Sequence, residues 1–125
     1  MTTSNTSQII YKELSYILNG IFFDVHNQMG RFAKEKHYAD LLEDVFKERN
    51  IKYAREHRII DTNDRIDFLI DEKIILEIKA KTLILKQDYY QTQRYLHATN
   101  KKLGLLVNFR NRYIKPIRVI NADIP

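Results

Sequence analysis

The sequence reads Arg65-Ile66-Asp67-Phe68-Leu69-Ile70, a turn at Asp71-Glu72-Lys73, and then Ile74-Ile75-Leu76-Glu77-Ile78-Lys79-Ala80. Both flanks are β-branched or aliphatic, which predicts a hairpin of two largely buried strands. Charged side chains are rarely buried unless they are paired or bound to a metal. The carboxylates and the ammonium group inside these strands therefore need an explanation.

Spacing along the strands indicates a metal site. Glu77 and Lys79 are two residues apart and project from one face of their strand. Asp67, on the neighbouring strand, can lie within reach of both. An oxygen-rich pocket of this kind suits Mg²⁺ or Mn²⁺ and leaves a lysine for chemistry. The alternative is a surface charge pair of Glu77 and Lys79, with Asp67 near a turn, because such short patterns also occur by chance.

Length and composition favour a single globular domain. The chain has 125 residues, of which 44% are hydrophobic, and we expect a loose tail over 1–6 and one domain over 7–125. The absence of Cys excludes disulfides and thiolate metal sites. The polar N-terminus does not resemble a secretory signal, and no apolar stretch approaches the roughly 18 residues of a membrane helix. We expect a cytoplasmic protein that does not associate with membranes.

The positive charge is concentrated in the second half of the chain. Net charge is +5, and residues 79–118 contain ten Lys and Arg residues opposed only by Asp88. Residues 1–78 contain 11 Lys and Arg against 14 Asp and Glu. This asymmetry is typical of a face that binds a polyanion such as nucleic acid. The alternative is that several of these lysines only keep the protein soluble.

Periodicity predicts a mixed α/β domain of order α-α-β-β-β-α-β-β. Helices are expected over 7–29, 34–49 and 86–99, and strands over 51–60, 65–70, 74–80, 103–109 and 113–120. Gly30 marks the end of the first helix, and Pro116 places the last strand at a sheet edge.

This order, with acids on the second and third strands, resembles the PD-(D/E)xK nuclease-like fold, whose core is α-β-β-β-α-β. Within that superfamily the chain is similar to the GxxExxY proteins. Five segments carry the resemblance: Val25-His26 with Met29-Gly30; Glu35-x-x-Tyr38; Asp67 with Glu77-Ile78-Lys79-Ala80; Gln91 with Tyr95-Leu96; and Leu103-Gly104-Leu105-Leu106-Val107-Asn108-Phe109. The chain departs from the family at Phe32, where a second glycine is usual.

The resemblance implies a set of site residues. Asp67, Glu77, the backbone carbonyl of Ile78 and Glu35 would hold Mg²⁺ or Mn²⁺, and Lys79 would position a water or stabilise charge at the phosphate. Further residues are expected to contact the nucleic acid: Lys79, Lys81, Gln91, Arg94, Tyr95, Lys101 and Lys102, with Tyr38 as an accessory residue.

Each of these side chains also has a structural explanation. Glu35 would be an exposed carboxylate at a helix N-terminus, and Lys79 would form a salt bridge with Glu77 or Asp67. Tyr38 would be a core residue, and Gln91 with Tyr95 would serve helix packing. We interpret His26 as a structural hydrogen-bonding residue.

The sequence leaves three functions open. The first is a divalent-metal-dependent nuclease that hydrolyses phosphodiester bonds of DNA or RNA. The second is a non-catalytic module on the same fold that binds nucleic acid or a protein. The third is a small assembly protein that forms a homodimer, and a homodimer is also compatible with the first function.

Overall fold

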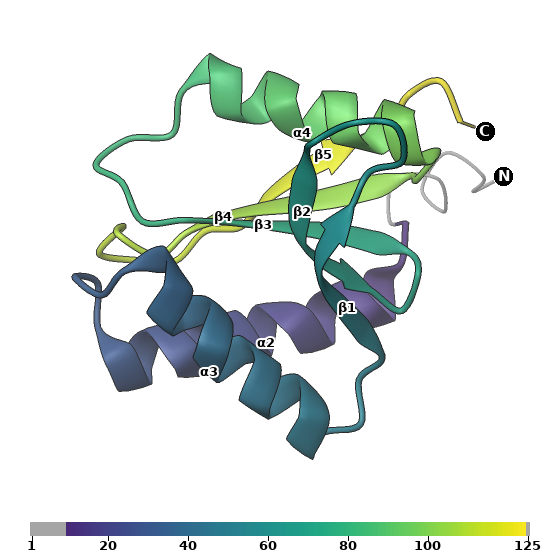
Figure 1. Cartoon of the computed structure of the whole chain (residues 1–125). Helices are drawn as coiled ribbons and strands as arrows, with labels where there is room; N and C mark the ends of the chain where they lie inside the picture. The colour runs from purple at the N-terminus through teal and green to yellow at the C-terminus, as the bar shows by residue number, and fades with distance from the viewer. Residues whose placement is uncertain (1–9, 125) are drawn as a thin grey trace, which may run out of the picture.

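A computed structural model describes residues 10–124, which form three helices and five strands in the predicted order (Figure 1). The elements are α2 (Lys12–Met29), α3 (Glu35–Glu48), β1 (Tyr53–Arg58), β2 (Arg65–Ile70), β3 (Ile74–Lys79), α4 (Lys86–Thr99), β4 (Leu103–Asn108) and β5 (Ile117–Ile120). The predicted tail over 1–6 lies outside the described residues. Among the helices of residues 10–124, none combines the length and apolar character needed to cross a bilayer.

The first and last predicted strands are markedly shorter than expected, and the third and fourth each end one residue earlier. The first begins at Tyr53 because the Ile51 amide donates to the carbonyl of Phe46 and ends the preceding helix. The last strand begins at Ile117 instead of residue 113. Pro116 has no N–H to donate to a ladder, and Ile114 turns its side chain into the core.

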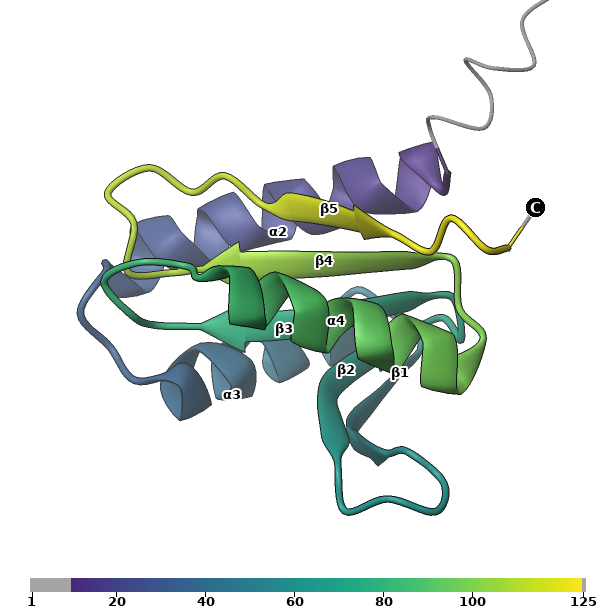
Figure 2. The same cartoon turned by 90° about the horizontal axis from the view of Figure 1, so that it is seen from above.

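The five strands form one sheet of order β1-β2-β3-β4-β5. β3 and β4 are parallel and joined through α4, whereas the other neighbours are antiparallel. Helices α2 and α3 cover one face and α4 covers the other (Figures 1 and 2). Each face has its own apolar cluster, and β4, in contact with both layers, is buried along its whole length. As the order of the sheet requires, β5 is an edge strand.

Three loops gather at one end of the molecule: α2–α3 (30–34), β3–α4 (80–85) and β4–β5 (109–116) (Figures 1 and 2). We call this the loop end. Gly30 makes the turn out of α2 with a positive φ of 75°, and its amide donates to the carbonyl of His26. His26 Nε2 in turn lies 2.8 Å from the carbonyl oxygen of Asn111, which confirms its structural role. Side chains thus connect loops that are far apart in sequence.

The hairpin of β1 and β2 is interrupted at one position. Pairing runs to Arg55↔Phe68 and resumes at His57↔Ile66, so Glu56 and Asp67 face each other without pairing. Glu56 has φ 51°, a left-handed conformation that costs a non-glycine residue about 1 kcal/mol or more. Because of the interruption, Phe68 packs under α2 and α3 whereas Ile66 packs under α4, although strand alternation would put both on one face. The hairpin bends there, and Asp67 lies at the bend.

Candidate functional site

Two hydrogen bonds link Asp67 to β3, one through the Glu77 carboxylate and one through the Ile78 amide. The Asp67 amide donates to Glu77 Oε2 at 2.8 Å, and the Ile78 amide donates to Asp67 Oδ2 at 2.7 Å. The regular ladder between β2 and β3 ends at Phe68↔Leu76, one residue before this pair. Carboxylate oxygens therefore take the place of backbone carbonyls where the two strands separate. The sequence correctly places the two acids on adjacent strands.

Burial makes the charge on both acids costly. Glu77 is only 4% exposed, and its burial, followed by the nearby charge of Asp67, raises its pKa to about 8. Burial also raises the pKa of Asp67, against the opposing effect of the Ile78 amide. Lys79 favours the ionised form of both acids and so acts to lower the pKa of each. In the described part of the chain, neither carboxylate forms a salt bridge.

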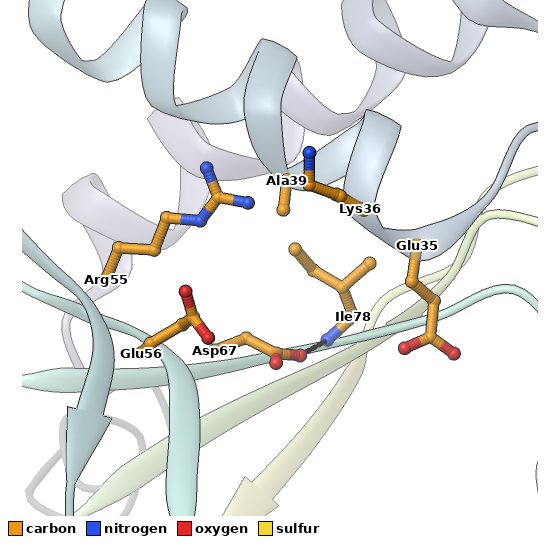
Figure 3. A pocket seen from close by; sticks show the side chains of 7 residues that line it. All are labelled: Glu35, Lys36, Ala39, Arg55, Glu56, Asp67 and Ile78. Atoms are coloured by element: carbon orange, nitrogen blue, oxygen red, sulfur yellow. Dashed lines mark hydrogen bonds between the residues drawn. The ribbon is translucent and has the colours of Figure 1, made fainter.

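A cavity of about 290 Å³ opens next to Asp67 (Figure 3). Its lining residues are Glu35, Lys36, Ala39, Arg55, Glu56, Asp67 and Ile78. Arg55 is already neutralised by ion pairs of 2.8 Å with Asp40 and 2.9 Å with Glu43. The carboxylates of Glu56 and Asp67 lie near each other on one side of the cavity in Figure 3. The cavity therefore has an acidic side formed by the bend of the hairpin.

The predicted ligands are only partly brought together. Glu35, the first residue of α3, is exposed, and its carboxylate is drawn apart from that of Asp67 in Figure 3, although its charge helps to raise the pKa of both Asp67 and Glu77. Glu77 does not line the cavity, although it is bonded to Asp67. Within residues 10–124 no group of three or more His, Asp or Glu side chains could hold a metal ion. The structure thus assembles two of the three predicted carboxylates.

Those two carboxylates fit a hard divalent cation. Glu77 is buried and Asp67 half-buried, and neither has a direct ion pair among the described residues, so a cation would offset an unfavourable charge. Mg²⁺ is commonly held by one or two carboxylates and keeps several waters. The donor set is therefore compatible with Mg²⁺ or Mn²⁺ without a third carboxylate.

Lys79 points toward α4. Its Nζ donates to Gln91 Oε1 at 3.4 Å and lies 3.9 Å from Asp88 Oδ1. Asp88 is held more closely by Lys81, whose Nζ lies 2.8 Å from Asp88 Oδ2. Lys79 therefore contacts Gln91 and Asp88, and its ammonium group is only loosely held.

Both predicted tyrosines are core residues. Tyr95 is 6% exposed and packs in the cluster under α4. Tyr38 is fully buried, stacks on Phe109 at a ring separation of 4.4 Å, and donates from Oη to the carbonyl of Gly30 at 2.5 Å. Tyr38 also accepts the Ala33 amide at 3.3 Å. It fixes the α2–α3 loop that leads into Glu35.

The predicted nucleic-acid contacts are divided between distant parts of the surface. Lys101 and Lys102 precede Leu103, which pairs with Ile74 at the start of β3, whereas Lys79 pairs with Asn108 at its end. Lys101 donates to the carbonyl of Glu72 in the turn between β2 and β3. Arg94 is exposed on α4. Of this set, Lys79, Lys81 and Gln91 lie near the acids.

Sequence reasoning missed two features. Glu56 belongs to no motif, and its place opposite Asp67 follows only from the strand register. The second feature is the positive charge of the loop end, and the sequence does contain a signal for it. The three loops of the loop end contain six basic residues and no Asp or Glu: Arg31, Lys34, Lys81, Arg110, Arg112 and Lys115.

Comparison with known proteins gives one match. The family model described as PD-(D/E)XK nuclease superfamily matches residues 12–120, a range that includes every helix and strand of the described fold. No curated protein and no solved structure matches the chain. The mixed sheet, the order of its helices and strands and the acids at the fork of β2 and β3 agree with this match. Since the match extends over most of its length, the chain belongs to the PD-(D/E)XK nuclease superfamily.

Proposed function

We propose that the protein is a divalent-metal-dependent nuclease that hydrolyses phosphodiester bonds of nucleic acid. The observation that carries the proposal is the pair of neighbouring acids, buried Glu77 and half-buried Asp67, at the fork of β2 and β3, with Lys79 two residues further along β3. Acids with little or no exposure to solvent, no salt bridge and raised pKa values are typical of functional sites. Within the superfamily, the segments around Glu35-x-x-Tyr38 and Leu103–Phe109 favour the GxxExxY branch.

Asp67, Glu77 and the carbonyl of Ile78 are the proposed ligands of Mg²⁺ or Mn²⁺. Such a cation, when bound, acidifies water and neutralises charge on the scissile phosphate. Lys79 would orient the attacking water or stabilise the charge that develops on the phosphate. Its loose contacts with Gln91 and Asp88 leave the ammonium group available for this role. Glu35, exposed at the entrance of the cavity, would hold a water from the opposite side.

The loop end supplies the charge that a nucleic-acid backbone needs. Its six basic residues lie at the end of the sheet where β3 finishes at Lys79, so phosphates bound there would be next to the acids. Contacts to phosphates position a nucleic acid without reading its sequence. We therefore expect binding that depends little on base sequence and strongly on salt.

A non-catalytic nucleic-acid-binding module is the second candidate. The position of Glu35 favours it, because the third predicted carboxylate does not join the other two. Both candidates predict nucleic-acid binding, and only the first predicts cleavage that requires a metal.

The decisive experiment is incubation with labelled single-stranded and duplex DNA and RNA in Mg²⁺, Mn²⁺ or EDTA. Wild type should cleave at least one of these substrates in Mg²⁺ or Mn²⁺ and none in EDTA. Glu77→Ala should be inactive, whereas Glu48→Ala, the same change at an exposed position at the end of α3, should retain activity. Salt-dependent binding without cleavage under any condition would instead support the binding module.

A further inference from the structure

Phe32 exposes a large aromatic ring at the loop end. Its side chain is 75% exposed, although it lies between residues with defined contacts. The guanidinium carbons of Arg31 and Arg110 lie over the ring, 4.9 Å and 5.5 Å from its centroid. An exposed aromatic residue alone needs no explanation. An exposed ring with two guanidinium groups beside it combines stacking surface with positive charge.

The surrounding contacts fix the position of this ring. Arg31 Nε donates to the carbonyl of Arg110, and Arg110 Nε donates to the carbonyl of Arg31, both at 2.9 Å. These bonds use Nε and leave the terminal Nη groups for other acceptors. Tyr38 holds both sides of the loop through Gly30 and Ala33. The loop that carries the ring is therefore held in place before any ligand arrives, which lowers the entropy lost on binding.

The ring also lies close to the proposed catalytic residues. Arg110 comes two residues after Asn108, which pairs with Lys79, and the Phe109 amide donates to the carbonyl of Lys79 at 2.9 Å. Glu35 follows Phe32 by three residues. Because Glu77 lies two residues before Lys79 on β3 and is bonded to Asp67, a nucleic-acid strand that touches the ring can continue toward both acids.

We propose that Phe32, with Arg31 and Arg110, forms a stacking platform for an unpaired base of single-stranded nucleic acid. The inference rests on the proposed function, because it names the form of substrate that the same site would take. Proteins that bind single strands without reading sequence stack the bases on aromatic rings. The rings lie in grooves whose positive charges follow the nucleic-acid backbone. In a duplex the faces of paired bases are covered by their neighbours, so the platform favours single strands and frayed ends.

Binding is measured without metal, so that cleavage plays no part. Wild type and Phe32→Leu are compared by fluorescence anisotropy in EDTA. The labelled ligands are single-stranded DNA, single-stranded RNA and a DNA duplex. We expect Phe32→Leu to weaken binding of single-stranded DNA, single-stranded RNA or both by about tenfold, because one base can no longer stack, and to change duplex binding little. Tyr16→Leu is the matched control, since Tyr16 is 80% exposed but lies near the start of α2. Melting temperatures of both variants should equal that of wild type.

A spectroscopic test separates stacking from a structural role. The chain has no tryptophan, so Phe32→Trp introduces a single indole at the platform. We expect this variant to bind single strands at least as tightly as wild type, and its fluorescence to be quenched by single-stranded oligonucleotide but much less by duplex.

Two results would overturn the inference. If Phe32→Leu binds single strands as wild type does and the Phe32→Trp fluorescence is unchanged, the platform does not exist, while metal-dependent cleavage by wild type would still uphold the nuclease proposal. If wild type binds no nucleic acid in any form and cleaves none, both proposals fail together.

Discussion

Glu77 is 4% exposed and lies beside a second carboxylate, and its pKa of about 8 compares with an ordinary value of 4.5. Below about pH 4.5 the acid is neutral in the folded and the unfolded chain. Between pH 4.5 and 8 the unfolded chain loses the proton while the folded chain keeps it. The stability contributed by the protonated acid is therefore lost as the pH rises through about 8.

Glu77→Gln should remove this pH dependence. The amide oxygen of glutamine still accepts the Asp67 N–H but cannot ionise. In EDTA we expect the free energy of unfolding of the variant to exceed that of wild type increasingly from pH 4.5 to 8, by on the order of a few kcal/mol at the upper end. Urea titrations at pH 4, 6 and 8 provide the measurement. A difference that does not vary with pH would show that Glu77 titrates normally.

Lys79→Ala should reduce cleavage about a hundredfold or more. The expected loss, on the order of 3 kcal/mol in the activation barrier, is that of removing one preorganised charge from the reacting phosphate. The melting temperature should change little, because the ammonium group has contacts of only 3.4 Å and 3.9 Å. Lys101→Ala, at the other end of β3 and β4, is the control in single-turnover assays. Equal rates for the two variants would exclude a role of Lys79 in the reaction.

The sequence predicts the position of Asp67 and Glu77 but not that of Glu35. A short turn sets the hairpin register Phe68↔Leu76, which is enough to bring Asp67 opposite Glu77. The direction of the Glu35 side chain depends on how α3 enters from the α2–α3 loop. That entry is fixed by Tyr38, whose contacts with Gly30 and Ala33 come from tertiary packing.

At the scale of the elements, α4 and β4 meet at a glycine. A Cβ at Gly104 would lie 2.8 Å from Cγ2 of Thr92, which is too close, and at an ordinary contact distance of 3.7 Å from Ile75 and Leu96. Thr92 Oγ1 donates to the carbonyl of Asp88 within the helix. Close approach of helix and strand therefore depends on one missing methyl group, and it places Gln91 beside Lys79.

Gly104→Ala should destabilise the protein by about 1–3 kcal/mol, as expected for overpacking in a closely packed core. Thr92→Ser removes Cγ2 and keeps the hydroxyl, so the double variant should recover most of the loss. Thermal unfolding of the two single variants and the double variant measures the coupling. Simple additivity of the two changes would mean that the clash is relieved elsewhere.

Helices and strands are largely predictable here because their apolar periodicity is strong. The ends of the predicted helix over 86–99 and of the predicted strand over 65–70 agree with α4 and β2, and the other elements differ by a few residues in the described range. The interruption of the hairpin at Glu56 and Asp67, by contrast, cannot be predicted from apolar periodicity. It requires two residues on separate strands to leave the ladder together, and no local pattern in either strand indicates such a pair.

At the scale of the whole molecule, the fold divides the basic residues in a way that their sequence positions conceal. Lys101 and Lys102 are close in sequence to Arg110 and Arg112, yet the length of β4 separates the two pairs. The basic residues of the α2–α3 loop come from residues 1–78, where acids are in excess. The positive face is thus created by topology.

Neutralising charges at the loop end should reduce the salt dependence of binding. For Arg112→Gln/Lys115→Gln we expect the slope of log affinity against log salt to become shallower by about 0.7 for each single-strand phosphate that is no longer neutralised. Lys101→Gln/Lys102→Gln removes the same charge at the opposite end and should leave the slope unchanged. Anisotropy titrations in EDTA over a range of NaCl concentrations compare the pairs. If both double variants change the slope equally, the net charge of the protein governs binding, and the position of the charges does not.

The fork of β2 and β3 has one more consequence. The amide protons of Asp67 and Ile78 are protected by ionisable side chains, whereas that of Lys73 is bonded to the backbone carbonyl of Ile70. The protection of these two amides against deuterium exchange should therefore change with pH and with added Mn²⁺ or Mg²⁺. The protection of the Lys73 amide should stay constant. Protection is measured relative to a free peptide at the same pH. Two positions of the main chain thus report the state of the side chains that they bind, and the occupancy of the site can be followed without a substrate.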